Sequence, residues 1–373
     1  MGKRLNNPED CTSRALLEKE EEAKKVIEGC KRANGFYASS QRYHALWLRD
    51  LVYSEDVLFK LGYVRDVENH LSEFMKLQRR NGQMPTTIDF SFSKLLPQRY
   101  QSCPSDTEIL FVIGMRKHAE FAGNQFFKEN EDAVKLCINF IENRLDEHQL
   151  IPGMDWRDAM PNYRGKCLLA NQMLLADMYD LLGNLTGANL VKDNVNKFFY
   201  SKNLCCYADT VHWEDGELEL DDNFDGLGNA LAILNGTASQ KVSEGILKRF
   251  DTAKTPFGYR NITPNYEFNR AKLLVTWYLT CGVANGTFLR NRPGMYQNSA
   301  IWPFVEIRVI DALRKLQETG EAEAATKLMI ERKGFNEFYD PTTGAPRGSE
   351  GQLWTAAAVI SAVNLCRSWQ EKA

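Results

Sequence analysis

The sequence predicts an all-α fold, an (α/α)6 toroidal barrel with one small β-hairpin, from three observations. Apolar residues at helical spacing recur about a dozen times over the 373 residues. Two of these segments, 168–182 and 355–365, are apolar nearly all round, as helices buried between other helices are. The loops before such segments carry the unusual polar and aromatic residues. Alternating inner and outer helices with functional loops at one end are typical of this barrel; an α-solenoid is the alternative.

The expected helices follow one another evenly along the chain. The spacing predicts a helix that begins at a Ser105 cap, and others over 9–33, 46–61, 64–78, 130–143, 168–182, 187–199, 227–234, 239–250, 271–279, 300–316, 322–331 and 353–369. Residues 204–220 alternate in polarity around Asp215-Gly216, which indicates the hairpin. Because no linker divides the chain and no 33- to 47-residue repeat is visible, we expect one domain over residues 1–373.

Composition excludes several classes of protein. The net charge is −3 without a dense basic block, so neither nucleic acid nor an anionic membrane is an expected partner. The longest apolar run, 273–284, is too short to span a bilayer, and the N-terminus lacks a signal-peptide core. Nine scattered cysteines without a CxxC pair, and only five histidines, argue against a zinc site and for reduced thiols. We therefore expect a cytoplasmic protein without a bound metal; nothing in the sequence predicts its oligomeric state.

The loop over residues 153–161 combines the groups that a sugar site needs. It places Asp155, Trp156, Arg157 and Asp158 between two prolines, which disfavour a continuous helix. An indole can stack on a sugar ring, charged groups can hold hydroxyls, and a carboxyl can transfer a proton. The alternative is a surface loop with an Asp–Arg pair.

Other polar and aromatic groups lie just before expected helices, each with a structural alternative. Arg49-Asp50, beside Trp47, can grip vicinal hydroxyls or form an ion pair at a helix start. Asp106 belongs to a helix cap or to the site. The acidic run 221–225, with Asn223, suits a solvated cap, a substrate contact or calcium, although the EF-hand spacing is missing.

Two more groups lie toward the C-terminus. Gln297-Asn298 followed by Trp302-Pro303 suits sugar hydroxyls and stacking, or a helix start with proline in its first turn. Glu337 lies among aromatic residues, a setting that raises a carboxyl pKa or leaves a base beside water. The alternative is a buried, paired glutamate.

The order of these motifs resembles the (α/α)6-barrel inverting glycosidases: glucoamylases, glycogen-debranching amylo-α-1,6-glucosidases and alkaline/neutral invertases. Trp156-Arg157-Asp158-Ala159, followed by Arg164-Gly165-Lys166, is similar to the Trp-x-Asp-Ala and Arg-x-Gly-Lys of the debranching enzymes. Segment 227–234 and Tyr296-x-Asn298-x-x-x-Trp302-Pro303 resemble invertase segments, and 336–340 resembles the segment with the catalytic base. The invertase sequence Ile-Asp-Arg-Arg-Met-Gly is not reproduced, and we do not expect the extra N-terminal domain that is common in archaeal and bacterial relatives of glucoamylase and the debranching enzymes.

The resemblance implies an inverting, exo-acting α-glycosidase on a small α-glucoside or oligosaccharide. It assigns Asp158 as general acid, with Asp155 as its rival, Glu337 as general base, and Arg49-Asp50 as the pair that holds the sugar. Such a pair of carboxyls stands roughly 6.5–9.5 Å apart. An invertase-like sucrose hydrolase, and a non-hydrolytic sugar-binding or epimerase barrel, are the alternatives. No metal or organic cofactor is required.

We also expect particular surroundings for the two carboxyls. Asp158 would hold its proton through burial against Trp156 and the nearby Asp155, with Arg157 turned elsewhere. Glu337 would remain ionised, with Tyr296 or Tyr339 holding its water. The expected substrate-binding residues are Trp47, Arg49, Asp50, Asp106, Asp155, Trp156, Lys166, Asn223, Gln297, Asn298, Trp302, Tyr339 and Trp354.

Overall fold

Helices dominate the computed structural model, which describes residues 13–89, 98–99, 105–160, 163, 165–267 and 290–371. The expected helix over 271–279 lies outside these residues. The helices are α1 (Ser13–Cys30), α2 (Leu48–Lys60), α3 (Val64–Lys76), α4 (Asp106–Ala122), α5 (Gln125–Glu129), α6 (Glu131–Glu142), α7 (Leu169–Leu181), α8 (Leu185–Phe198), α9 (Gly226–Leu234), α10 (Gln240–Ala253), α12 (Pro303–Lys315), α13 (Thr319–Glu331) and α14 (Leu353–Gln370). The predicted helical class is therefore confirmed.

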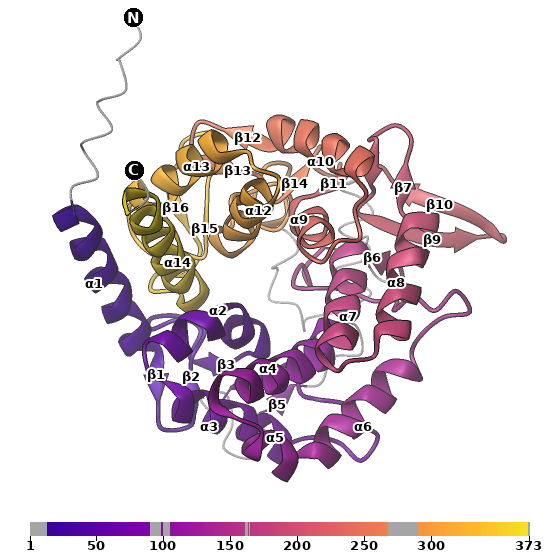
Figure 1. Ribbon diagram of the computed structural model, residues 1–373, viewed down its shortest axis with the longest axis horizontal. Helices are drawn as coiled ribbons and strands as arrows, with labels where there is room; N and C mark the ends of the chain where they lie inside the picture. Colours follow the sequence, from indigo (N-terminus) through magenta and orange to yellow (C-terminus); the bar gives the residue numbers. More distant parts are fainter. Residues whose placement is uncertain are drawn as a thin grey trace, which may run out of the picture.

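The helices are arranged as a ring that the chain follows once, so that α1 and α14 lie side by side (Figure 1). Inside the ring, α2 packs on α4, α4 on α7, α7 on α9, α9 on α12, α12 on α14, and α14 on α2 again. Outside, α8 packs on α7, α10 on α9, and α13 on both α12 and α14. The packing thus forms a closed inner layer with a second layer of helices around it.

The segments that precede the inner helices are joined to one another by backbone hydrogen bonds. Leu353 N–H donates to Ala38 O, Ile301 N–H to Tyr339 O, and Leu169 N–H to Asp209 O. These segments also form the short strands β1 (Lys31–Arg32), β2 (Gly35–Phe36), β3 (Ala45–Leu46), β4 (Thr87–Asp89), β5 (Gln98–Arg99), β6 (Cys167–Leu168), β7 (Tyr200–Ser201), β8 (Cys206–Tyr207), β11 (Phe224–Asp225), β12 (Lys254–Thr255), β13 (Gly258–Tyr259), β14 (Ile262–Thr263), β15 (Phe338–Tyr339) and β16 (Pro346–Arg347). Residues far apart in sequence are thereby brought together at the ends where the inner helices begin.

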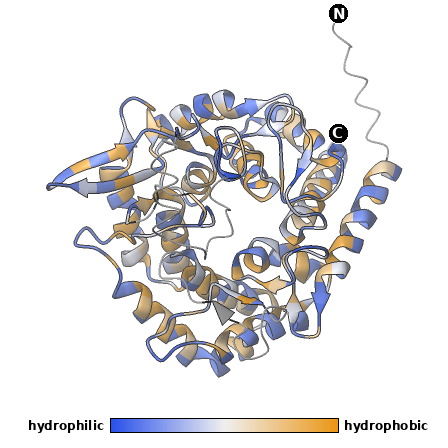
Figure 2. Cartoon of the chain, turned by 180° about the vertical axis from the view of Figure 1, so that it is seen from behind, coloured by the Kyte–Doolittle hydropathy of each residue, from blue (hydrophilic) through white to orange (hydrophobic). Residues whose placement is uncertain are grey.

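The predicted hairpin is confirmed over β9 (Thr210–Glu214) and β10 (Glu217–Asp221), which pair antiparallel and extend away from the ring (Figure 2). Both residues of its two-residue turn, Asp215 and Gly216, have positive φ angles, 52° and 85°. This turn type matches the twist of the two strands, and it explains the Asp-Gly pair.

One hydrophobic cluster runs through the whole ring, from Leu16 on α1 to Val363 on α14. A cluster of this extent is what the predicted single domain needs, because both ends of the chain contribute to it. No helix in the described part of the chain is long and apolar enough to cross a membrane. Within the same residues, no group of three or more His, Cys, Asp or Glu could hold a metal ion.

Local details of the elements differ from the expectation in two places. The five-residue helix α5 was not predicted, because a single turn carries too little periodicity. Ser105 precedes α4 as predicted, but its side chain does not cap the helix. Its hydroxyl donates to Pro152 O over 2.6 Å and so ties the start of α4 to the loop over 153–161.

Candidate active site

The loop that carries Asp158 lies between α6 and α7 and is non-helical, as its prolines predict. Its stems pair where Gly153 N–H donates to Lys166 O over 2.8 Å. From α7, Asn171 Nδ2 donates to the carbonyls of Gly153 and Met154. These bonds fix the loop against the beginning of an inner helix.

Arg157 turns into the protein interior, away from Asp158. Its guanidinium forms ion pairs with Asp155 (2.6 Å), Asp209 (2.9 Å) and Asp225 (3.5 Å), and all four side chains are buried. Burial raises the pKa of Asp209 and of Asp225, and Arg157 opposes that rise. Asp155 is thus part of a buried network that stabilises the loop. It was expected to contact substrate or to rival Asp158 as the acid, and its burial with Arg157 favours neither role.

Replacing Arg157 by Met should destabilise the fold by about 3–5 kcal/mol at pH 7, because three buried carboxyls lose their cation. The loss should shrink at pH 5, where protonating Asp209 and Asp225, whose pKa values burial already raises, costs less. Urea denaturation at both pH values measures this. The matched change Arg14→Met removes an exposed pair with Glu18 and should leave the midpoint almost unchanged. An Arg157→Met midpoint equal to that of the wild type would contradict the account of this network.

Arg49, in the first turn of α2, holds Asp158 from the opposite side. Its Nη2 donates to Asp158 Oδ2 over 2.8 Å, and its Nη1 donates to Trp156 O over 2.8 Å. Its Nε lies 3.8 Å from Asp106 Oδ2, and its guanidinium covers the ring of Trp47. On the other oxygen, Gln297 Nε2 lies 3.4 Å from Asp158 Oδ1. Asp158 is therefore fixed between Arg49 and Gln297, with its side chain 22% exposed.

Glu337 lies in the segment before β15 and is bonded at both oxygens. Ser349 N–H donates to Oε2 over 3.1 Å, and the Tyr296 hydroxyl lies 3.4 Å from Oε1. Burial raises the pKa of Glu337 to about 7, whereas Ser349, Arg290, Tyr296 and Arg42 lower it. This is the setting among aromatic residues that was expected to raise a carboxyl pKa, and Glu337 would be ionised at a working pH above about 7.

Gly348 allows the backbone to approach Glu337. Its φ angle is +75°, and a Cβ atom there would lie 2.5 Å from Glu337 Oε2 and 2.6 Å from Glu337 Cβ. Any other residue at this position would meet both backbone strain and a clash with the glutamate. The requirement for glycine arises from the folded structure and was not visible in the sequence.

Asp158 and Glu337 both act on Tyr296, and Glu337 also acts on Asp50. The pKa of Tyr296 is raised by burial first and then by the charges of Glu337, Tyr43 and Asp158. The pKa of Asp50 is raised to about 7 by burial and, after the opposing effect of Arg49, by the charge of Glu337. Two carboxyls from loops far apart in sequence therefore border one group of polar side chains.

The four tryptophans expected to bind substrate lie in different environments. Trp156 and Trp302 are 2% and 1% exposed and pack edge to face, with ring centroids 4.8 Å apart. Trp354 is also buried and stacks on Phe304 at 4.4 Å. Trp47 is half-buried beneath Arg49. Trp156, Trp302 and Trp354 are thus core residues, and Trp47 alone of these four is partly exposed.

Asn298 and Tyr339 anchor loops. Asn298 is fully buried, and its amide bonds the backbone of Tyr266 and Asn291. Tyr296 or Tyr339 was expected to hold a water on Glu337. The Tyr339 hydroxyl instead donates to Gly334 O over 2.9 Å. Tyr296 is the tyrosine that faces this carboxyl.

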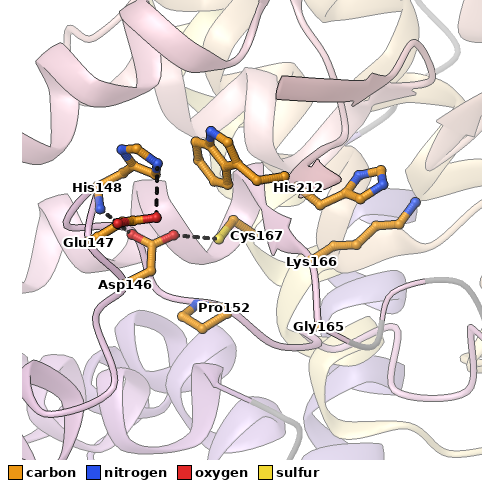
Figure 3. A pocket seen from close by; sticks show the side chains of 9 residues that line it. Asp146, Glu147, His148, Pro152, Gly165, Lys166, Cys167 and His212 are labelled. Atoms are coloured by element: carbon orange, nitrogen blue, oxygen red, sulfur yellow. Dashed lines mark hydrogen bonds and ion pairs between the residues drawn. The ribbon is translucent and has the colours of Figure 1, made fainter. Parts of the chain in front are cut away.

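Lys166 and Asn223 lie near the hairpin. Lys166 Nζ donates to Asp221 Oδ2 over 2.6 Å, and Asn223 Nδ2 donates to Pro264 O over 2.7 Å. Lys166 lines a pocket of about 340 Å³ together with His148, Cys167 and His212 (Figure 3). Neither Asp158 nor Glu337 lines this pocket, so the structure does not place Lys166 with the paired carboxyls.

Several residues of the site were missed or undervalued in the sequence. Tyr43, Arg290 and Arg42 act on or respond to Glu337 through their charge. Gln352 donates to Asp50 Oδ1 over 3.0 Å, and Ser349 bonds Glu337. Gln352 could have been predicted as a site residue from its position just before an inner helix. Nothing in the sequence distinguished Tyr43 or Arg42 from other surface residues.

With this geometry, the fold can be compared with known proteins. No protein-family model matches the chain. A mannosylglycerate hydrolase of Thermus thermophilus is 38% identical over 74 residues, which cover 18% of this chain and 17% of the relative. A mitochondrial neutral/alkaline invertase of Oryza sativa subsp. japonica is 28% identical over 185 residues, 45% of this chain and 28% of the invertase. The matched stretches thus span less than a third of each relative.

Solved glycosidase structures share the fold over almost the whole chain. A GH63 mannosylglycerate hydrolase of Thermus thermophilus, in complex with Tris and D-glycerate, superposes with a TM-score of 0.69 at 14% identity, covering 92% of this chain and 99% of that one. A glycosidase in complex with glucose has a TM-score of 0.67 at 10% identity, with coverages of 97% and 99%. A rhamnosidase of Klebsiella oxytoca with rhamnose bound has 0.65 at 12%, with coverages of 95% and 64%. At these identities the likeness establishes the fold, and the resemblance to this group of glycosidases is confirmed.

Proposed function

We propose that the protein is an inverting glycoside hydrolase built on an (α/α)6 barrel as a single catalytic domain. It acts from the end of a small α-glucoside or oligosaccharide, with Asp158 as general acid and Glu337 as general base. The observation that carries this is that adjacent residues of α2 reach both carboxyls: Arg49 bonds Asp158, and Asp50 is linked to Glu337 through Gln352 and Ser349. Both carboxyls also act on Tyr296. The glycosidase relatives and structural neighbours support the reaction class.

The contacts of Asp158 suit a proton donor in one orientation. Arg49 occupies Oδ2 with a short, charge-assisted bond, whereas the contact of Gln297 to Oδ1 is long at 3.4 Å. The proton for the leaving oxygen would therefore sit on Oδ1. Arg49 would fix the orientation of the Asp158 carboxyl and hence the direction in which its proton is transferred.

The contacts of Glu337 suit a base on the far side of the sugar. Its carboxylate takes a proton from water as that water attacks the anomeric carbon, and the carbon–oxygen bond to the leaving group breaks. Tyr296 is close enough to orient both the carboxylate and the water. Asp50 and Arg49, at the start of α2, would hold the sugar hydroxyls between the two carboxyls.

The pH dependence of the rate should have its acidic limb near pH 7. The pKa of Glu337 is raised by burial to about 7, so the ionised base is lost as the pH falls below that value. Well below pH 7, kcat/KM should fall about tenfold per pH unit. Because the Tyr296 hydroxyl lowers this pKa, Tyr296→Phe should move the limb to higher pH. A rate that stays level down to pH 5 would contradict this assignment.

The reaction class is tested by an activity screen over maltose, isomaltose, trehalose, sucrose, glucosylglycerate and their mannose analogues. Release of a free monosaccharide from at least one of them is the expected result. The invertase relative makes a sucrose hydrolase the second candidate, and cleavage of sucrose alone would establish it. Sugar binding without hydrolysis of any glycoside would favour a non-hydrolytic barrel.

An epimerase on this fold would need histidines beside the site, and the histidines lie elsewhere. His70 and His118 pack among the helices, His148 and His212 line the pocket near the hairpin, and His44 stacks on Tyr37. Acid–base catalysis by imidazole has therefore no support in these positions.

A further inference from the structure

Gln352 lies between two carboxyl groups of the site, those of Asp50 and Glu337. Its side-chain nitrogen donates to Asp50 Oδ1 over 3.0 Å, and its side-chain oxygen accepts a short bond from the Ser349 hydroxyl. The backbone N–H of Ser349 donates to Glu337 Oε2 over 3.1 Å. A continuous chain of hydrogen bonds thus leads from Asp50, on α2, to Glu337, in the segment before β15.

The members of this chain are held in place by bonds on either side. Gln352 and Ser349 are each 2% exposed, and Gln352 N–H donates to Phe335 O over 2.9 Å. Glu337 N–H donates to Ser349 O over 2.9 Å, and Ser39 Oγ donates to Glu350 O over 2.7 Å. The segment that includes Ser349 and Gln352 is therefore fixed both to the glutamate and to the residues before α2.

The polarity of the amide sets its orientation. The carboxylate of Asp50 can only accept, so the amide nitrogen must face Asp50 and the amide oxygen therefore faces the Ser349 hydroxyl, which donates to it. A donor at Asp50 favours the ionised carboxylate. Burial raises the pKa of Asp50 to about 7, Arg49 lowers it, Glu337 raises it, and Gln352 lowers it. Gln352, like Arg49, thus favours the charged form of Asp50 beside a second buried carboxyl.

We propose that Gln352 is a positioning residue for the hydrolysis: it holds Asp50 as a charged acceptor for a sugar hydroxyl and fixes Asp50 relative to the base Glu337. This inference rests on the function proposed above. In this arrangement the sugar-binding carboxylate and the base are joined by one rigid connection, so disturbing Gln352 changes substrate binding and proton transfer together.

The test must account for every charged or titratable group that acts on the two carboxyls. Around Asp50 these are Arg49 from α2 itself, Cys30 from the end of α1, and Glu337; around Glu337 they are Arg42, Tyr43, Arg290 and Tyr296. None of them is altered by a substitution at residue 352 or 349. A shift of the pH profile in Ser349→Ala can therefore be assigned to the hydrogen-bond chain, whereas a shift in Gln352→Glu includes the charge that this variant adds.

The variant Gln352→Glu keeps the shape of the side chain and places a third carboxyl against Asp50. The added negative charge raises the pKa of Asp50 and of the nearby Glu337, so the acidic limb of kcat/KM on 4-nitrophenyl α-D-glucopyranoside should move up by about one pH unit. KM should rise about tenfold, because Asp50 is then partly protonated. Asp50→Asn combined with Gln352→Glu restores a donor–acceptor pair with the roles exchanged. It should recover the thermal midpoint of the wild type without recovering its KM.

Gln240→Glu, the same change on the exposed face of α10, serves as control and should leave both KM and the pH profile as in the wild type. If Gln352→Glu does not fold, Ser349→Ala decides, because it removes the hydroxyl and keeps the backbone bonds to Glu337; KM should then rise about threefold. If the wild type is active and the variant that folds has the same KM and pH profile, the role of Gln352 is overturned and the proposed function is not. A wild type inactive on every glycoside of the screen would overturn the proposed function instead.

Discussion

Glu337→Gln should lower kcat by about 10²–10⁴-fold, because the general base is replaced by a group that cannot accept the proton of water. The fold should be retained, since the amide oxygen can still accept from Ser349 N–H and no charge remains to be buried. Turnover of 4-nitrophenyl α-D-glucopyranoside and the urea midpoint, measured together, separate these two effects.

Two further measurements sharpen the assignment of Glu337. Glu318→Gln, the same substitution at an exposed position, should leave kcat unchanged. Azide, an anionic nucleophile that needs no deprotonation, should restore turnover of the Glu337→Gln variant by forming the β-glycosyl azide. Near-normal turnover of Glu337→Gln in water would remove this residue from the role of base.

Asp158→Asn should lower kcat to an extent that depends on the leaving group. An alcohol needs a proton as it departs, so hydrolysis of maltose should fall by about 10²–10⁴-fold. Fluoride leaves with much less assistance, so hydrolysis of α-D-glucosyl fluoride should fall far less. The ratio of the two rates, compared with that of the wild type, measures the acid role directly.

Asp155→Asn distinguishes the two aspartates of the loop. Asp155 is bound by the guanidinium and the backbone N–H of Arg157, so its substitution should reduce stability and affect both substrates alike. The opposite pattern would exchange the roles of the two residues. In that case Asp158→Asn lowers kcat on maltose and on the fluoride by the same factor, and Asp155→Asn lowers it selectively on maltose.

Much of the architecture was predictable because it depends on local sequence. Apolar periodicity gave helices such as α3, whose observed start at Val64 is the predicted one. Asp215-Gly216 gave the hairpin, because few residue pairs adopt two positive φ angles. The loop over 153–161 was visible from its prolines. These features need no knowledge of what packs against them.

The roles within the site depended on contacts between distant segments and could not be read from spacing. Spacing alone does not separate Asp155 from Asp158, although the Trp-x-Asp-Ala resemblance favours Asp158. The ion pairs of Arg157 with Asp155, Asp209 and Asp225, which come from distant segments, are what place Asp155 in a buried network. The sequence offered Tyr296 and Tyr339 as equally good partners for Glu337. In the structure the Tyr339 hydroxyl bonds Gly334 O, and only the Tyr296 hydroxyl lies near Glu337. Trp302 was expected to offer a face to the sugar and instead fills the core beneath the site.

The stereochemistry of the product tests the central claim most directly. Proton NMR during hydrolysis of an α-glucoside that the enzyme cleaves records which anomer appears before mutarotation mixes the two forms. A water activated by Glu337 on the face opposite Asp158 predicts that the β-anomer of glucose forms first. The α-anomer as the first product would mean retention of configuration and would contradict the roles assigned to both carboxyls.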